Sequence, residues 1–165
     1  MKSVELISHI QQFVELTDAD IALINTAFKE KNCKKKEHLL EADQICHKQY
    51  FILKGCLRNY IINKKGVEQT LQFGIENWWI TDYMSFDNRK PSAFFIQAVE
   101  KSTVLEIEKS AFDELLLKVP KLEKYFRIIL QRSFAASQMR INFLFTMSAE
   151  ERFHHFNNAF PTFVQ

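Results

Sequence analysis

The chain has 165 residues and a mass of 19.5 kDa, which suits one compact domain with room for a further long helix and excludes a two-domain enzyme. Hydrophobic residues make up 47% and charged residues 25%, a globular balance that excludes a disordered or low-complexity protein. The net charge is only +2, so no global positive field marks the chain as a nucleic-acid binder.

The N-terminal part of the chain predicts two amphipathic helices. Apolar residues recur at helical spacing over residues 4–14, and Thr17 followed by Asp20 forms a capping-box pattern that opens a second helix, up to Phe28. Five lysines in residues 29–36 then indicate a solvated turn and the exposed edge of a sheet, since edge lysines guard against pairing with other chains. We therefore expect two helices before the first strand.

Residues 37–108 have the pattern of many short strands. Runs rich in Tyr, Phe, Ile, Leu, Val and Thr are separated by polar turns. Residues 56–62 and 67–73 are predicted to pair as one hairpin, and residues 93–99 and 103–108 as another. Short strands with regular turns favour a sandwich or a small barrel, such as a double-sheet jelly roll.

The longest predicted element is a helix over residues 121–147, which contains no Gly or Pro and would be roughly 40 Å long. A short helix that Ser110 caps and Pro120 ends comes before it. The apolar residues of the long helix occupy two faces. One face can pack on the β region, and the other indicates a partner. A second copy of the chain is the simplest partner, and the alternative is burial of the whole helix within one chain. The predicted dimer interface consists of Leu122, Phe126, Ile129, Ser133, Ala136, Arg140, Phe143 and Met147.

A further helix is predicted after the long one, because Ser148 and Glu151 repeat the capping-box pattern. We expect this helix to run to the neighbourhood of Phe160 and Pro161. It contains Arg152 as its only basic residue apart from histidine, so these residues by themselves are not expected to bind DNA specifically.

The order of these elements, together with four sequence segments, resembles the Crp/Fnr family of transcriptional regulators. The segments are HLLEAD at 38–43, YFILKGCLR at 50–58, EQTL at 68–71 and AVEKSTVLEI at 98–107. The resemblance implies an α+β fold: a double-stranded β-helix (jelly roll) cyclic-nucleotide-binding-like domain with N-terminal helices and a long C-terminal dimerisation helix. It also implies that Gly55 occupies a hairpin turn whose backbone angle only glycine tolerates well.

The resemblance divides the chain into three parts. Residues 1–119 would be the jelly-roll sensor domain, residues 120–147 the dimerisation helix, and residues 148–165 the start of an incomplete helix-turn-helix domain. The chain would then be the effector-sensing and dimerisation part of a regulator. It would act as a homodimer that contacts DNA only through a C-terminal domain beyond Gln165. The alternative is a stand-alone effector-binding or scaffold domain of the same fold that does not bind DNA.

The phosphate-binding cassette of the family is altered. Cyclic-AMP-binding members have a Gly-Glu pair that holds the ribose and an Arg, followed by Ser or Ala, that neutralises the phosphate. The corresponding places here hold Ile80-Thr81 and Ser92-Ala93. A buried phosphate without its arginine keeps an uncompensated charge, so ordinary cyclic-AMP binding is not expected. An effector of unknown identity would bind in a candidate pocket formed by Trp79, Ile80, Thr81, Asp82, Ser92, Ala93 and Phe94. The alternative is that the aromatic side chains of this segment are plain core.

The remaining motifs argue against an enzyme. The three glycines form no dinucleotide or P-loop motif, and no G-x-S-x-G or cysteine-protease context occurs. The three cysteines match no zinc or iron–sulfur spacing, and His38 and His47 lie nine apart, with no His-x-His that a cupin-like metal site would favour. We expect no catalytic residue, no metal and no fixed cofactor. The absence of a signal-like or membrane-spanning stretch predicts a cytoplasmic protein without a membrane partner.

Overall fold

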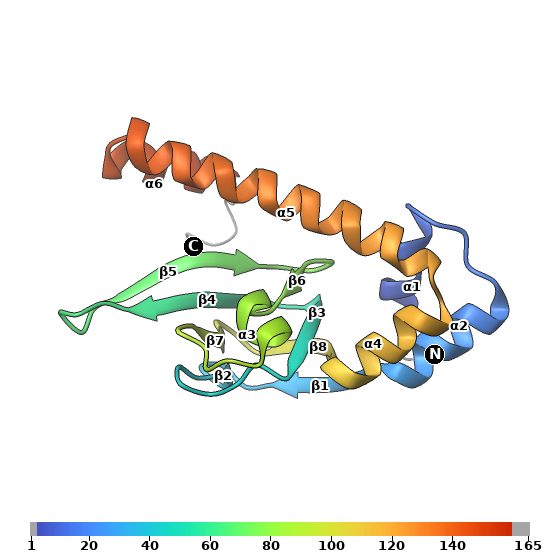
Figure 1. Cartoon of the computed structure of the whole chain (residues 1–165). Helices are drawn as coiled ribbons and strands as arrows, with labels where there is room; N and C mark the ends of the chain where they lie inside the picture. The colour runs from blue at the N-terminus through green and yellow to red at the C-terminus, as the bar shows by residue number, and fades with distance from the viewer. Residues whose placement is uncertain (1–2, 160–165) are drawn as a thin grey trace. The chain divides into compact units, whose positions relative to one another are not determined.

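The computed structural model describes residues 3–159, which divide into two units after Glu123 (Figure 1). The first unit is built on two four-stranded antiparallel sheets with the orders β1-β8-β3-β6 and β2-β7-β4-β5. The strands are β1 Lys29–Cys33, β2 His38–Leu40, β3 Lys48–Lys54, β4 Leu57–Ile62, β5 Glu68–Gly74, β6 Trp79–Ile80, β7 Phe95–Ala98 and β8 Ser102–Glu108. This arrangement confirms the predicted jelly roll.

One hydrophobic core lies between the two sheets. Tyr50, Ile52 and Val104 of the first sheet and Leu57 and Ile96 of the second belong to it, and each is at most 5% exposed. Side chains alternate between the faces of a strand. The neighbouring residues in the chain therefore face away from this core, on the outer sides of the two sheets.

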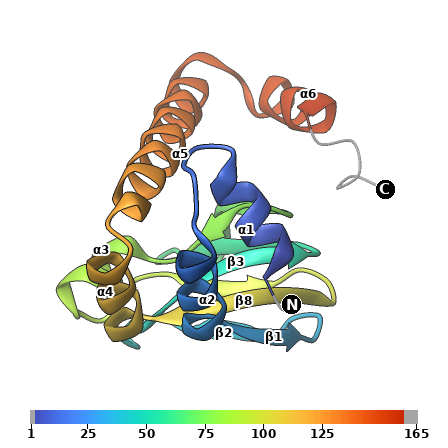
Figure 2. The same ribbon diagram turned by 90° about the vertical axis from the view of Figure 1, so that its right-hand side faces the viewer.

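A second core covers the outer face of the β1-β8-β3-β6 sheet. Three helices take part: α1 Val4–Gln11, α2 Asp18–Ala27 and α4 Lys109–Lys118 (Figure 2). Phe51 and Leu105 point outward from the sheet and are fully buried, as is Leu6 of α1. The ring of Phe51 lies 5.6 Å from that of His9. The capping box expected at Thr17 is present, which fixes the start of α2.

Gly55 makes the turn between β3 and β4 with a φ of +91°. A Cβ atom at this position would lie 2.5 Å from the Ser102 hydroxyl oxygen and 2.9 Å from the Lys101 carbonyl oxygen. The turn therefore requires glycine both for its backbone angle and for space. This agrees with the role that the resemblance implied.

One predicted hairpin is wrong. Residues 95–98 form β7 and residues 102–108 form β8, but these strands belong to different sheets. β7 pairs with β2 and β4, while β8 pairs with β1 and β3. The short connection at residues 99–101 crosses from one sheet to the other instead of folding the chain back on itself. The other predicted hairpin, between β4 and β5, is confirmed.

The second unit consists of helical residues after Glu123. Helix α5, Lys121–Thr146, starts in the first unit and continues through the second, where α6, Ala149–Ala159, follows it. The Ser148 amide donates to the Glu151 carboxylate and the Glu151 amide donates to the Ser148 hydroxyl, so the predicted capping box opens α6. The predicted end of this helix near Phe160 and Pro161 lies outside the described residues. Within residues 3–159, none of the helices combines the length and apolar character needed to cross a membrane.

Candidate functional site

The predicted pocket residues lie on either side of the short helix α3, Tyr83–Asn88, in the chain: Trp79 to Asp82 come before it and Ser92 to Phe94 after it. Asp82 is the N-cap of this helix and is only 4% exposed. Its Oδ1 accepts hydrogen bonds from the backbone amides of Met84 at 3.0 Å and Ser85 at 3.2 Å. The carboxylate thus satisfies amide donors at the start of the helix.

Ser92 lies in the segment that leads into β7 and also contacts Asp82. We call Asp82, Ser92 and the amides of Met84 and Ser85 the α3 corner. The Ser92 hydroxyl donates a 2.6 Å hydrogen bond to Oδ2 of Asp82, and its oxygen accepts one from the Phe94 amide at 2.9 Å. The structure therefore brings Asp82 and Ser92, two of the predicted pocket residues, into direct contact. The donors gathered at the start of α3 are engaged by a carboxylate of the chain itself.

The other predicted pocket residues point in different directions. Ile80 belongs to the core between the sheets, whereas the ring of Trp79 lies 5.3 Å from that of Phe51 in the second core. The Thr81 hydroxyl donates to the Lys48 carbonyl at 3.0 Å. Ala93 is exposed and Phe94 is half-buried. Most of these side chains serve packing or local hydrogen bonds, and they do not converge on one point.

Basic residues close to α3 lie outside this corner. Arg89 ends the helix in the left-handed conformation, with a φ of +54°, and both Arg89 and Lys90 are exposed. The backbone carbonyl of Lys90 accepts a hydrogen bond from the Ser85 hydroxyl, which itself accepts one from the Cys46 amide. These contacts fix the segment against the core and leave the two charged groups in solvent.

A cavity of about 260 Å³ lies elsewhere, along the edges formed by β1 and β2. None of the seven predicted pocket residues lines it. Two pairs of its polar groups are bonded within the chain: the Lys48 ammonium lies 2.8 Å from the Glu106 carboxylate, and the Tyr50 hydroxyl donates to the Leu39 carbonyl at 3.1 Å. The sequence did not indicate this cavity, which is lined mostly by side chains of residues 38–50, with Lys31 of β1 and Glu106 of β8 completing its walls.

The cysteines lie in the interior as free thiols. Burial raises the pKa of the Cys33 thiol to about 11 and that of Cys56 to about 12, so both stay protonated and unreactive at neutral pH. Cys46 is also buried, with its sulfur 3.3 Å from the Thr81 hydroxyl. Among the described residues, no group of three His, Cys, Asp or Glu side chains is placed to hold a metal ion.

Helix α5 exposes a stripe of large apolar side chains. With 3.6 residues per turn, these side chains fall on one side of the helix. Phe134 is 65% exposed and Phe145 is 87% exposed. The members of this stripe, which we call the α5 stripe, are Leu130, Phe134, Ile141, Leu144 and Phe145.

The predicted dimer interface lies about a quarter turn around the helix from the α5 stripe. Along it, Leu122 and Phe126 are buried, Ala136 is exposed, and Ile129, Ser133, Arg140, Phe143 and Met147 are half-buried. The ring of Phe143 lies 4.6 Å from that of His155 in α6. Partial burial lowers the pKa of Arg140, whose guanidinium donates to the Ser137 hydroxyl at 2.8 Å.

Comparison with known proteins agrees with the jelly-roll fold described above. The model of the family "Cyclic nucleotide-binding domain" matches residues 30–118. The anaerobic regulatory protein of Haemophilus influenzae is 30% identical over 79% of this chain and 50% of its own length. A cyclic nucleotide-binding domain from Methylobacillus flagellatus superposes with a TM-score of 0.74 at 15% identity, covering 88% of this chain and 85% of that one. The Thermus thermophilus catabolite activator protein gives a TM-score of 0.67 at 15% identity, covering 82% and 62%.

The chain belongs to the cyclic nucleotide-binding domain family, in the branch represented by the Crp/Fnr-type regulators. The family match covers most of the first unit, from β1 to the end of α4. The chain spans about half the length of the curated relatives that it matches.

Proposed function

We propose that this chain is the effector-sensing and dimerisation part of a Crp/Fnr-type transcriptional regulator, located in the cytoplasm and without enzymatic activity. The observation that carries the proposal is a long helix that continues directly from the jelly-roll unit and exposes the α5 stripe. Relatives in which the matched stretch makes up about half of the length are named as regulatory proteins. DNA contact would then come from a domain beyond Gln165, and the three parts of the chain would have the roles expected from the sequence.

The effector of this sensor is not cyclic AMP held in the usual way. A cyclic phosphate at the start of α3 would have to displace the Asp82 carboxylate from two amides and from Ser92. Bound beside that carboxylate, the phosphate would meet a like charge with no cation in place, since Arg89 and Lys90 are exposed. Both arrangements are costly because buried like charges repel and lose their hydration. An effector that enters this corner would have to be uncharged there, or carry a hydrogen-bond donor towards Asp82.

The partner of the helix is a second copy of the chain. A solvent-exposed aromatic and aliphatic stripe is costly unless it is covered, and a long helix that pairs with its own copy covers it symmetrically. We place the α5 stripe at the centre of this contact. The predicted interface residues, from Leu122 to Met147, would form the flank of this dimer contact, to one side of the α5 stripe. Ile129 and Ser133 would lie at the edge of the contact.

A reporter experiment tests this function in cells. The chain is fused to a heterologous DNA-binding domain that represses a reporter gene only as a dimer. The proposal predicts strong repression by the wild-type fusion and loss of repression by a Phe134→Asp fusion expressed at the same level. Repression no stronger than that of the DNA-binding domain alone would contradict the dimerisation role, and with it the proposed transmission of a signal from the sensor domain.

A further inference from the structure

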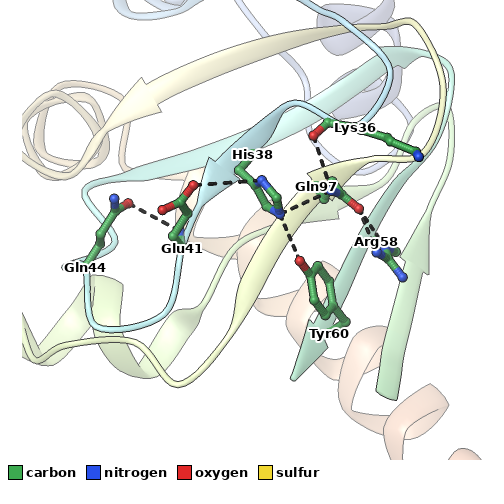
Figure 3. Close-up of polar contacts among 7 residues, drawn as sticks. All are labelled: Lys36, His38, Glu41, Gln44, Arg58, Tyr60 and Gln97. Carbon is green, nitrogen blue, oxygen red and sulfur yellow. Dashed lines mark hydrogen bonds and ion pairs between the residues drawn. The ribbon is translucent and has the colours of Figure 1, made fainter. Parts of the chain in front are cut away.

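A hydrogen-bonded cluster on the outer face of the β2-β7-β4-β5 sheet links three of its strands (Figure 3). His38 comes from β2, Gln97 from β7, and Arg58 and Tyr60 from β4. The Nε2 atom of His38 lies 2.8 Å from the Tyr60 hydroxyl and 3.1 Å from Nε2 of Gln97. Three strands are thus joined at one imidazole nitrogen.

The orientation of the Gln97 amide is fixed from both ends. A guanidinium can only donate, and both Nε and Nη2 of Arg58 contact the same Gln97 atom, at 3.0 and 2.7 Å, so that atom is the amide oxygen. On the opposite side, a backbone carbonyl can only accept. The Lys36 carbonyl, 3.2 Å away, therefore faces the Gln97 amino group.

The fixed amide determines the protonation state of His38. The amino group of Gln97 can only donate, so Nε2 of His38 must present its lone pair. The neutral ring then carries its proton on Nδ1. The Tyr60 hydroxyl donates to the same lone pair, and burial raises the pKa of Tyr60, which keeps that donor protonated.

We propose that His38 is a pH-sensitive clamp, which holds β2 against β7 and β4 while the ring is neutral and releases it when the ring is protonated. A proton on Nε2 would point at the amino group of Gln97, so one of the two hydrogen bonds to Nε2 must break. The Tyr60 hydroxyl can reverse its role and accept, but Gln97 cannot rotate without losing Arg58 and Lys36. Acidification that protonates this ring therefore drives the release.

The charges around the ring favour movement away from Gln97. Nδ1 of His38 lies 3.8 Å from the Glu41 carboxylate, which would attract the protonated ring towards solvent. On the opposite side, Arg58 of β4 repels a second positive charge, although Glu68 of β5 pairs with it at 2.6 Å. β7 contributes only uncharged neighbours, Gln97 and Phe95.

Strand β2 is a suitable element for such a release because it makes few strand–strand pairs, although Leu40 also packs in the core between the sheets and the Tyr50 hydroxyl donates to the Leu39 carbonyl. It is three residues long, lies at the edge of its sheet, and pairs with β7 only at His38↔Gln97 and Leu40↔Ile96, with an irregularity between them. The preceding turn is attached to β7 by the Lys36 amide, which donates to the Ala98 carbonyl at 2.8 Å. Loss of the Gln97 contact would loosen both the strand and this turn.

Nitrogen-15 NMR of the histidine rings in the whole chain tests the clamp directly. At pH 8 the His38 ring is expected to show a protonated Nδ1 and an unprotonated Nε2. The opposite tautomer, with the proton on Nε2, would overturn the proposal regardless of any variant. Exposed histidines usually favour the Nε2–H form, so His154, which is 64% exposed at its side chain, serves as the internal reference.

Amide hydrogen exchange tests the release. Exchange rates are corrected for the intrinsic effect of pH and expressed relative to the Val99 amide, which bonds the Cys56 carbonyl outside the cluster. Between pH 7.5 and 5.5, the protection of the Lys36 amide should fall about tenfold, the effect of one lost hydrogen bond. The fall should persist in His154→Gln and disappear in His38→Phe, which keeps an aromatic ring but cannot titrate. Unchanged Lys36 protection in the wild-type chain would contradict the release.

Discussion

The Ser92 hydroxyl donates a 2.6 Å hydrogen bond to the Asp82 carboxylate, ten residues earlier in the chain. This pair closes the start of α3 with a negative charge that belongs to the protein. The neighbouring amides of Met84 and Ser85 are bonded to the same carboxylate. The place where the resemblance predicts the altered phosphate-binding cassette is therefore already occupied by a carboxylate of the chain itself.

The first prediction concerns the ligand. Titration calorimetry of the wild-type chain with cyclic AMP should show no binding tighter than about millimolar. The reason is that the phosphate would replace or face the Asp82 carboxylate without an arginine to neutralise it. A micromolar dissociation constant would show that the cassette rearranges around the nucleotide and would contradict this interpretation.

The second prediction concerns the stability that the same contacts provide. Asp82→Ala removes the helix cap and leaves the buried Ser92 hydroxyl with only the longer 3.3 Å contact to the Phe94 carbonyl, so it should lower the free energy of unfolding by about 2 kcal/mol. Asp87→Ala, an exposed change within the same helix, is the matched control and should cost about 0.5 kcal/mol or less. Urea denaturation measures both. Equal effects of the two changes would mean that the Asp82 contacts contribute nothing specific.

The third prediction is a pH dependence at Asp20. The Lys121 ammonium, 2.8 Å away, and the Thr17 amide lower the pKa of this carboxyl from 3.8 to about 2. A group with a lowered pKa in the folded state stabilises the protein above its unfolded pKa, and this stabilisation is lost as the pH falls from about 4 to 2.

Asp20→Asn should therefore destabilise the chain by about 1 kcal/mol at pH 7, the modest value expected of a solvent-screened ion pair. Its stability and that of the wild type should converge as the pH approaches 2. Asp18→Asn, in the same first turn of α2, is the control and should show a smaller difference at every pH. A difference for Asp20→Asn that stays constant from pH 7 to 2 would exclude the ionised pair as its cause.

The fourth prediction compares two glycines with positive φ. Gly55→Ala should destabilise the chain by about 3 kcal/mol, because its Cβ would clash with Ser102 and Lys101 in addition to the backbone strain. Gly66→Ala has open space around it and should cost only the strain, about 1 kcal/mol. Thermal or urea unfolding checks the ranking. Equal losses would show that the crowding at Gly55 is relieved by movement of the Ser102 side chain.

Local sequence patterns predicted much of the fold. The capping boxes at Thr17 and Ser148, the lysine-rich edge strand β1 and the β4–β5 hairpin depend on neighbouring residues, and all are present. The error at β7 and β8 has a physical reason. A short connection between two strands is the same in sequence whether it returns within one sheet or crosses to the other, and only long-range pairing decides which.

The candidate site shows the same limit. The family resemblance predicted an altered phosphate cassette, with Ile80-Thr81 and Ser92-Ala93 at the corresponding places. It did not show that Asp82 turns back onto Ser92, because that contact depends on the path of the chain between them. The predicted dimer interface, from Leu122 to Met147, likewise selected one face of α5. The exposure of Phe134 and Phe145 on another face depends on how the helix is covered.

Multi-angle light scattering of the chain at tens of micromolar tests the dimer through α5 most directly. The wild type should have twice the monomer mass of 19.5 kDa. Phe134→Asp should reduce the mass to that of one chain, whereas Leu117→Asp, which removes an exposed apolar side chain from α4, should remain dimeric. Loss of the dimer in Phe143→Asp as well would extend the contact to the predicted flank. A wild-type mass of 19.5 kDa would contradict the proposed dimer and the signalling role built on it.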